Sequence, residues 1–542
     1  MRFRLTMTDI VGFTGRFRRR RKTRLKTPGP KPFDAKGRSL LDERIWRLGY
    51  VALLWLSAWL LQVMDVPFVA LNGIWASTRW LGDGLLLLAG VCACLALLRM
   101  LDSLPASRKM TVLQLCAISL LGLVPAKWTL ILNQLYGHLP ATTLYILPLA
   151  LTPLLAAILL GPVYALALGL WGSLAISLFA DYSYPLLLTG VVTTAIVTRL
   201  VRNVRTRLAV LRIGLAAGFA GVCCAVGFGA ISGETGFEMG RQALMSMGGG
   251  LISAVLALLL LPLLEVVFGM PTDMTLLELA DREHPLLKRL AEEAPGTYHH
   301  SLMTANLAQS AANAIGCNAL LAGICAYFHD VGKLVKPEYF SENIPYDANP
   351  HDELSPHMST LVIISHVKEG VNLALRYKLP PPIVDAIQQH HGTGMVSYFY
   401  HKANAQRTPK DRDATELRED SFRYPGPRPQ SKEVAILSVA DAIEAASRSM
   451  EKISPSHIEG LVDEIITTKR DDGQFDMCGL TMAELQKIRR AFIFTLTNMM
   501  HGRIAYPNAD ENRNQQPTGA GSGESGSDSG PAPVPHGSGL PA

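Results

Sequence analysis

The chain has 542 residues, a length that argues against a single typical domain. Hydrophobic residues make up 49% of the chain and charged residues only 18%, a balance typical of a membrane protein with a soluble part. Much of the net charge of +6 comes from an N-terminal arm of basic residues that precedes the first apolar run. Such an arm can bind nucleic acid or anionic lipid, but its place in this chain favours a cytoplasmic topology anchor.

The eight cysteines do not form a recognisable scaffold. Five lie in apolar segments and three are scattered through the second half of the chain, without the paired spacing of zinc ligands or of a disulfide framework. We therefore expect the soluble part to lie in a reducing compartment. The first apolar run begins near Leu48, behind a long polar leader, which is too late for an ordinary cleaved signal peptide.

Residues 1–45 are predicted to form a basic cytoplasmic tail, because Pro28, Pro30 and Pro32 interrupt any helix there. Residues 46–268 are predicted to form a transmembrane domain, because they contain successive apolar runs near the length of about 20 residues that crosses a bilayer. We count eight runs, at 48–64, 81–98, 110–132, 142–160, 163–180, 184–200, 213–231 and 243–268.

Basic residues test this count of membrane spans. They follow the second, sixth and eighth runs, whereas the segments after the first, third, fifth and seventh runs carry few. Because Lys and Arg favour the cytoplasmic side, eight crossings predict a multi-pass protein of the cytoplasmic membrane with both termini inside. Lys127 lies within the third run and could be functional or could reach toward the interface. Glu265, near the inner end of the eighth run, could act as a connector or as a ligand.

A linker and a second domain are predicted after the membrane runs. Within residues 269–285, Pro271 and Thr272 can end one helix and cap the next. Residues 286–507 show apolar residues at helical intervals and no alternating strand pattern of any length, so we predict an all-α fold with a polytopic helical membrane domain followed by a cytoplasmic helical domain. Residues 508–542 are rich in Gly, Ser and Pro and are predicted to be a disordered tail.

Imidazole and carboxylate groups recur through the helical domain. They are His300, His329, Asp330, His366, His390, His391 and Asp441. Fe, Mn and Zn accept these ligand types. Because His329 and Asp330 are adjacent, one backbone position can direct ligands to two neighbouring metals, and the two oxygens of Asp330 can bridge them. Two ions about 3.5–4 Å apart suit the hydrolysis of phosphate esters.

Lys333 lies one helical turn beyond Asp330. It could neutralise a phosphate oxygen in the transition state, which would place it beside Asp330 in a catalytic role. Without such neighbours, the same residue would be interpreted as a solvated lysine at a helix end.

These residues resemble the HD superfamily of metal-dependent phosphohydrolases, in its HD-x-G-K form. Further segments resemble the 7TM-HD family of cyclic di-AMP phosphodiesterases, over about 142–507. The segments are 293–301 (EAPGTYHHS), 349–352 (NPHD), 365–368 (SHVK), 389–393 (QHHGT), 422–427 (FRYPGP) and 473–474 (GQ).

The resemblance implies a cytoplasmic HD-type phosphohydrolase domain that holds two divalent metal ions, usually Fe or Mn. By motif position, one metal would be held by His300, His329, Asp330 and Asp441, and the other by Asp330, His366, His390 and His391. His299 is the less expected member of its pair, because the family ligand directly precedes the position of Ser301. The implied substrate is cyclic di-AMP, cleaved to linear pApA in second-messenger turnover. We expect membrane lipid as a partner, leave a homo-oligomer open, and expect no nucleic acid polymer.

One departure from the family affects regulation. The family usually has a large extracytoplasmic domain after its first membrane helix, whereas only residues 65–80 separate the first two runs here. We expect control to come through the membrane helices or a partner subunit.

Three alternatives stay open. HD sites also cleave cyclic di-GMP, other nucleotides and (p)ppGpp, and the ligand set alone does not separate these substrates. A non-catalytic nucleotide-binding membrane receptor is the second, although none of the expected ligands is missing. A transporter is the third, although the repeat and broken-helix signals of transporters are weak in this sequence.

Overall fold

The computed structural model describes residues 51–63, 79–101, 109–136, 141–201, 204–344, 349–407, 417–450 and 454–501, together with Gly49. These residues are mostly helical, and their only β contact is an isolated bridge between Met395 and Arg423. The prediction of an all-α fold is therefore confirmed. The two predicted tails, 1–45 and 508–542, and most of 65–80 lie outside the described residues.

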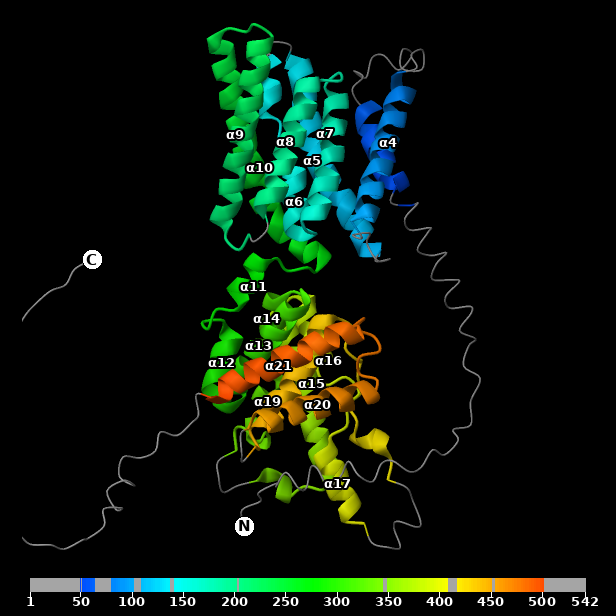
Figure 1. Ribbon diagram of the computed structural model, residues 1–542, viewed down its shortest axis with the longest axis vertical. Helices are drawn as coiled ribbons and strands as arrows, with labels where there is room; N and C mark the ends of the chain where they lie inside the picture. Colours follow the sequence, from blue (N-terminus) through cyan, green and yellow to red (C-terminus); the bar gives the residue numbers. More distant parts are fainter. Residues whose placement is uncertain are drawn as a thin grey trace, which may run out of the picture.

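The helices form two bodies, one above the other in Figure 1, joined through the short helix α11. The upper body holds α4 (Arg79–Met100), α5 (Lys109–Tyr136), α6 (Leu151–Leu159), α7 (Pro162–Phe179), α8 (Tyr184–Leu200), α9 (Arg207–Ile231) and α10 (Gly236–Phe268). A further helix covers Val51–Val63. The domain boundaries given above stay predictions.

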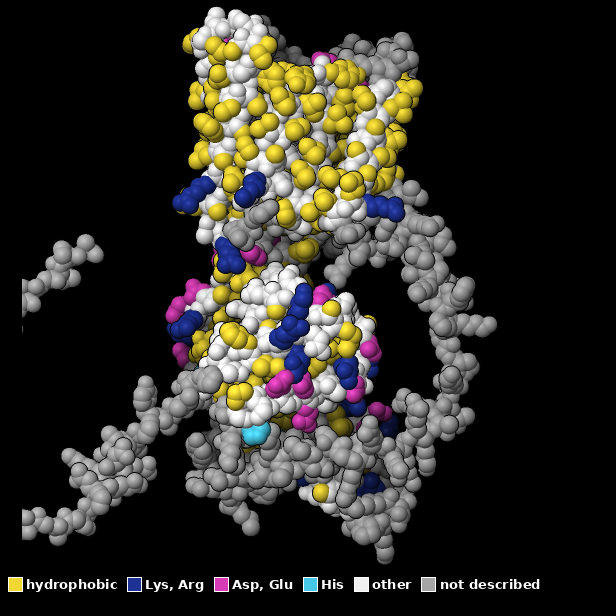
Figure 2. Space-filling view, in the orientation of Figure 1, with side chains coloured by type: hydrophobic (Ala, Val, Ile, Leu, Met, Phe, Trp, Pro, Cys, Tyr) yellow, Lys and Arg dark blue, Asp and Glu magenta, His cyan; other side chains and the backbone are white. Residues whose placement is uncertain are grey.

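The upper body has the surface of a membrane domain. Five of its helices are long and apolar enough to cross a membrane, at Trp80–Met100, Leu113–Leu132, Pro162–Phe179, Arg207–Ile231 and Gly236–Phe268. Three shorter apolar helical segments cover Val51–Val63, Leu144–Leu159 and Tyr184–Leu200. Together these eight segments coincide in position with the eight apolar runs. Figure 2 shows hydrophobic side chains over the visible face of this body, with Lys and Arg near the edge that faces the lower body.

The fourth apolar run is not one continuous helix. A 3-10 helix covers Ala141–Ile146, and α6 begins only at Leu151. Pro148 lies between them, and proline disfavours the α-helical conformation of the residue before it. Every residue from Leu151 to Ala157 is buried, so α6 lies inside the bundle, where it contacts α5, α7, α8 and α10.

Helices α9 and α10 form a hairpin in which their backbones touch. A Cβ added at Gly250 would lie 2.4 Å from Gly214 O, and one added at Gly214 would lie 2.7 Å from Gly250 O. Small residues allow this close approach, which is a common basis of helix packing in membranes. Deeper in the bundle, Lys127 is only 2% exposed and its Nζ lies 4.8 Å from the centre of the Phe179 ring. Lys127 is therefore enclosed by the bundle.

The joint between the two bodies is held by Glu265. Its Oε1 accepts a hydrogen bond from Thr272 N (2.8 Å) and its Oε2 accepts one from Thr275 Oγ1 (2.7 Å). Both donors lie at the start of α11 (Asp273–Leu279), so the carboxylate caps this helix and fixes it to the end of α10. This geometry supports the connector role among the two considered for Glu265. An exposed ion pair of 2.8 Å between Arg207 and Glu278 adds a weaker link from α9.

The lower body is built around α13 (Pro295–Ile315), which contacts α14, α19 and α21. The remaining helices are α12 (Pro285–Glu293), α14 (Ala319–Phe328), α15 (Pro356–Arg376), α16 (Pro381–Gln389), α17 (Ser397–Ala405), α19 (Lys432–Ser447), α20 (Pro455–Asp471) and α21 (Met482–His501). Two hydrophobic clusters fill this body, one around Phe328 and one around Phe492. The polar residues discussed next come from α13, α15 and α19 and from the C-terminal ends of α14 and α16.

Candidate metal centre

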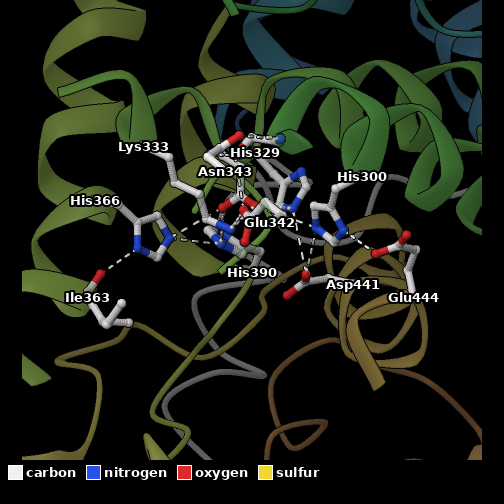
Figure 3. A network of polar contacts seen from close by, with 12 residues as sticks. His300, His329, Lys333, Glu342, Asn343, Ile363, His366, His390, Asp441 and Glu444 are labelled. Atoms are coloured by element: carbon white, nitrogen blue, oxygen red, sulfur yellow. Dashed lines mark hydrogen bonds and ion pairs between the residues drawn. The ribbon is translucent and has the colours of Figure 1, made fainter. Parts of the chain in front are cut away.

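The structure brings all seven side chains singled out from the sequence to one place. His300 lies on α13, His366 on α15 and Asp441 on α19, while His329 and His390 are the C-terminal caps of α14 and α16. Asp330 and His391 directly follow these two caps. Figure 3 shows the labelled histidines and Asp441 converging from separate helices. His299, the less expected member of its pair, is exposed and lies outside the cluster.

The side chains form two groups with suitable spacing for metal ions. One group contains His300, His329, Asp330 and Asp441, and the other contains Asp330, His366, His390 and His391. Within each group, the potential ligand atoms lie within 4.8 Å of one another. These are the two sets that the family resemblance implies, and their role as ligands stays a prediction.

Asp330 belongs to both groups because its two oxygens face in different directions. Its Oδ2 lies 3.2 Å from His329 Nε2 and 3.5 Å from His300 Nε2. Its Oδ1 lies 3.4 Å from His366 Nε2 and 3.7 Å from His390 Nε2. Each oxygen therefore serves one group, which is the geometry of a bridging carboxylate.

Three of the imidazoles are oriented by the backbone. His329, His366 and His390 each place Nδ1 at 2.6–2.8 Å from the carbonyl oxygen three residues earlier, at Ala326, Ile363 and Ile387. Donation from Nδ1 fixes the tautomer and leaves the Nε2 lone pair directed into the cluster.

One buried atom at the centre lacks a hydrogen bond. His329 Nε2 is inaccessible to solvent and has no partner of acceptable hydrogen-bond geometry, although it faces Asp330 Oδ2 at 3.2 Å. Buried polar atoms in folded proteins are nearly always satisfied, so this nitrogen needs a further partner. A metal ion would supply one, and the mixture of imidazole and carboxylate suits Fe, Mn or Zn.

The electrostatics differ between the two groups. Burial alone would lower the pKa of His300 and His329, but the nearby carboxylates outweigh it and raise the pKa of His329 to about 10. Burial lowers the pKa of His366, and burial together with the charge of His329 lowers that of His390 to about 3. Burial would raise the pKa of Asp330, but its cationic neighbours hold it well below the usual range.

Lys333 is placed beside Asp330, on the 3-10 helix Val331–Val335. Its Nζ lies 2.8 Å from Asp330 Oδ2 and 2.7 Å from Glu342 Oε1. Glu342 also accepts a hydrogen bond of 3.0 Å from Thr297 Oγ1. Lys333 is therefore part of a buried ion-pair chain and is not a solvated lysine.

Sequence reasoning missed Glu342 and Glu444. Glu342 lies in a segment that shows no periodic signal, so no pattern in the sequence distinguishes it from other acidic residues. Glu444 lies three residues after Asp441, on the same face of α19, and its Oε2 is hydrogen-bonded to His300 Nδ1. The spacing of three residues between two acidic side chains on one helix could have drawn attention to it.

The turn after His391 is held by a separate polar network. Gln474 accepts a hydrogen bond from Thr393 N (3.1 Å) and donates one to Thr393 Oγ1 (2.9 Å). Arg423 donates to Thr393 O (3.0 Å). The ring of Tyr424 stacks on His391, with 4.3 Å between ring centres. Residues from two distant segments thus fix the orientation of His391.

Two family models match the chain. Residues 77–272 match the model described as "7TM receptor with intracellular HD hydrolase", and residues 297–446 match the HD domain. The two matched segments follow one another in the chain, the 7TM segment first and the HD domain second. The 7TM-HD match begins after the helix Val51–Val63 and contains α4 to α10, so one of the eight apolar segments precedes it. The HD match contains all seven clustered residues and agrees with a centre for divalent metals.

Curated relatives of this chain include two proteins named "Cyclic-di-AMP phosphodiesterase PgpH". The one from Bacillus subtilis (strain 168) is 48% identical over 275 residues, which are 51% of this chain and 38% of the relative. The one from Listeria monocytogenes is 42% identical over 271 residues, which are 49% of this chain and 37% of the relative. The matched segment thus spans less than two fifths of either relative.

Among solved structures, the L. monocytogenes PgpH HD domain in complex with cyclic-di-AMP is 42% identical. The match covers 40% of this chain and 99% of that chain, with a TM-score of 0.38.

Proposed function

We propose that the chain is a membrane-anchored, metal-dependent phosphodiesterase that hydrolyses cyclic di-AMP to pApA in second-messenger turnover. The observation that carries the proposal is the pair of ligand groups that share Asp330, each oxygen of which faces one group. The names of the two relatives, at 48% and 42% identity, favour cyclic di-AMP among the substrates of HD sites.

We assign two divalent ions, Fe or Mn, to the two ligand groups. When bound, such a pair lowers the pKa of a coordinated water and neutralises charge on the phosphate oxygens. Asp330 and the three other residues of each group would hold its ion. The hydrogen bonds from the Nδ1 atoms keep the imidazole rings in place, so little reorganisation is needed during the reaction.

The products follow from the bond that breaks. The oxygen of water adds to phosphorus, the bond from phosphorus to the 3′ oxygen breaks, and the 3′ oxygen takes up a proton. Linear pApA with a 5′ phosphate results. Lys333 has three N–H donors, of which two face Asp330 and Glu342. We assign the third to a phosphate oxygen, where the ammonium would offset the negative charge that develops.

We place the HD domain on the cytoplasmic side of the membrane. Arg199 lies in the last turn of α8 and Arg207 begins α9, so the connection between these helices is basic. Arg207 also pairs with Glu278 of α11, so this basic end of the bundle is the end next to the HD domain. Lys and Arg concentrate on the cytoplasmic side of membrane proteins, which supports this orientation.

The test uses the full chain, purified in detergent and loaded with Mn²⁺. It is offered cyclic di-AMP, cyclic di-GMP and ppGpp, and the products are separated by chromatography. We expect pApA from cyclic di-AMP and a loss of at least about a hundredfold in rate for Asp330→Ala. Cleavage of cyclic di-GMP alone would overturn the substrate assignment. Retained binding of cyclic di-AMP without turnover by the metal-loaded protein would instead support the receptor alternative.

A further inference from the structure

The two ligand groups carry different charges. The group with His300 and His329 includes two carboxylates, Asp330 and Asp441, whereas the group with the other histidines includes only Asp330. An imidazole binds a metal in its neutral form, and with neutral imidazoles and Asp330 counted in both groups the formal charges are −2 and −1. Lys333 contacts the Asp330 oxygen of the first group, but its charge is offset by its ion pair with Glu342. The additional carboxylate, Asp441, therefore attracts a divalent cation more strongly to the first group.

The two groups also differ in what supports their imidazoles. His329, His366 and His390 donate from Nδ1 to neutral backbone carbonyls. His300 Nδ1 instead contacts the carboxylate of Glu444. A carboxylate on Nδ1 increases the electron density at Nε2 and makes the imidazole a stronger ligand than a carbonyl does.

Glu444 is placed to act through His300 and not as a ligand itself. It contacts Nδ1, whereas His300 Nε2 faces Asp441 Oδ1 at 3.1 Å, so the ring separates Glu444 from the cluster (Figure 3). Glu444 is only 5% exposed, and its other oxygen accepts a hydrogen bond of 2.9 Å from Arg448 Nε. Asp441 and Glu444 lie one turn apart on α19, so a single helix supplies a potential ligand and the support of another.

We propose that Glu444 is a positioning residue that makes the His300 group the tighter of two metal positions, so that the chain takes up its two ions in a fixed order. The inference rests on the metal assignment in the proposed function. It goes beyond that assignment because it ranks the two positions and names the side chain that sets the rank.

The test measures metal binding directly. The full chain in detergent is stripped of metal and equilibrated with Mn²⁺ in chelator buffers, and bound Mn²⁺ is counted by mass spectrometry. We expect two separate steps in the unaltered protein. Glu444→Gln keeps the size of the side chain and one acceptor oxygen but removes the charge. It should weaken the first step by about ten- to a hundredfold and leave the second nearly unchanged.

Two variants serve as controls. Arg448→Met removes the other partner of Glu444 but keeps the contact with His300, so it should change the first step much less than Glu444→Gln. His390→Gln removes a member of the second group only, so it should abolish the second step and keep the first. Glu444→Gln in the His390→Gln background should still weaken the remaining step.

Several results would overturn the inference. In the unaltered protein, these are a single binding step or no bound Mn²⁺ at all. In His390→Gln, the result is loss of the first step. In Glu444→Gln, the results are equal weakening of both steps or no change in either. The proposed substrate is tested separately. A chain that binds Mn²⁺ in two steps but leaves cyclic di-AMP intact refutes the substrate and supports the metal order.

Discussion

Gly269, which caps the C-terminus of the membrane helix α10, lies against Pro381, the first residue of α16. A Cβ added at Gly269 would lie 3.1 Å from Pro381 Cγ. Helix α16 spans Pro381–Gln389 and is followed at once by His390 and His391. The end of the last membrane helix is therefore in contact with the helix that positions two of the clustered histidines.

We predict that Gly269→Ala disturbs α16. Gly269 has φ of 62°, so alanine there costs about 1–2 kcal/mol in backbone strain in addition to the contact with Pro381. Hydrogen exchange should become faster in α16, and Mn²⁺ binding in the group with His390 should weaken. Gly316→Ala is the matched control, because Gly316 has φ of 74° but open space around its Cβ position. If both variants change hydrogen exchange in α16 equally, the contact between Gly269 and Pro381 does not couple α10 to α16.

Gly332→Ala should separate Asp330 from His366. A Cβ at Gly332 would lie 1.8 Å from His366 O and 2.5 Å from Gly370 N, both backbone atoms of α15. We expect a loss of about 1–3 kcal/mol in the free energy of unfolding and weaker binding of one Mn²⁺ ion. Urea unfolding and metal counting would measure these effects. Gly460→Ala, with nothing within 4 Å, should leave metal binding unaltered, and the same result for Gly332→Ala would contradict the prediction.

The structural role of Lys333 can be distinguished from its proposed catalytic role by combining substitutions of Lys333 and Glu342. Lys333→Met leaves the buried carboxylates of Asp330 and Glu342 without their cation and should cost about 3 kcal/mol in unfolding free energy. Adding Glu342→Gln removes one of these carboxylates and should restore part of that stability. The rate of cyclic di-AMP hydrolysis should remain reduced on the order of a hundredfold in both variants, because the donor to phosphate is missing. If the double variant recovers the rate, Lys333 has only a structural role.

The start of α21 should show a pH dependence that comes from Glu484. Thr481 and Glu484 form a reciprocal cap, and Glu484 also pairs with Lys432. The hydrogen bonds from Lys432 and from the Thr481 backbone lower the pKa of Glu484 to about 2, from 4.5. Because the folded-state pKa is depressed, the stabilisation is present above about pH 4.5 and is lost as pH falls toward about 2.

Glu484→Gln tests this directly, because glutamine keeps the shape of the cap but not the charge. The variant should be less stable than the unaltered protein by a few tenths of a kcal/mol near pH 7, since the ion pair is close to the surface. The difference should shrink below about pH 4.5. Hydrogen exchange of the first turn of α21, followed against urea at several pH values, would measure it. A constant difference down to pH 3 would contradict the assignment to the charge of Glu484.

The all-helical fold and the cluster were predictable because their signals are local. His329 and Asp330 are adjacent, and the residue type alone shows that imidazole and carboxylate groups can act as metal ligands. Glu444 could not be ranked in the same way, because its role depends on His300, which lies 144 positions away in the sequence. Glu342 lies only nine positions from its partner Lys333, but in a segment without helical periodicity, so the sequence does not show that the two side chains meet.

The membrane part shows a different limit of sequence reasoning. The run 142–160 is apolar throughout, so hydropathy alone predicts one span. The break before α6 depends on Pro148 and on burial of Leu151 to Ala157 by neighbouring helices. Burial by neighbours cannot be inferred from the composition of one segment, because lipid and protein both favour the same apolar side chains.

One carboxylate oxygen of Asp330 lies in each ligand group, and this arrangement has a thermodynamic consequence. An ion held by Oδ2 would withdraw charge from Oδ1, so occupancy of either position would change the affinity of the other by the same factor. The affinity of each position for its ion therefore depends on whether the other position is occupied. Every measurement of one must state whether its neighbour was filled.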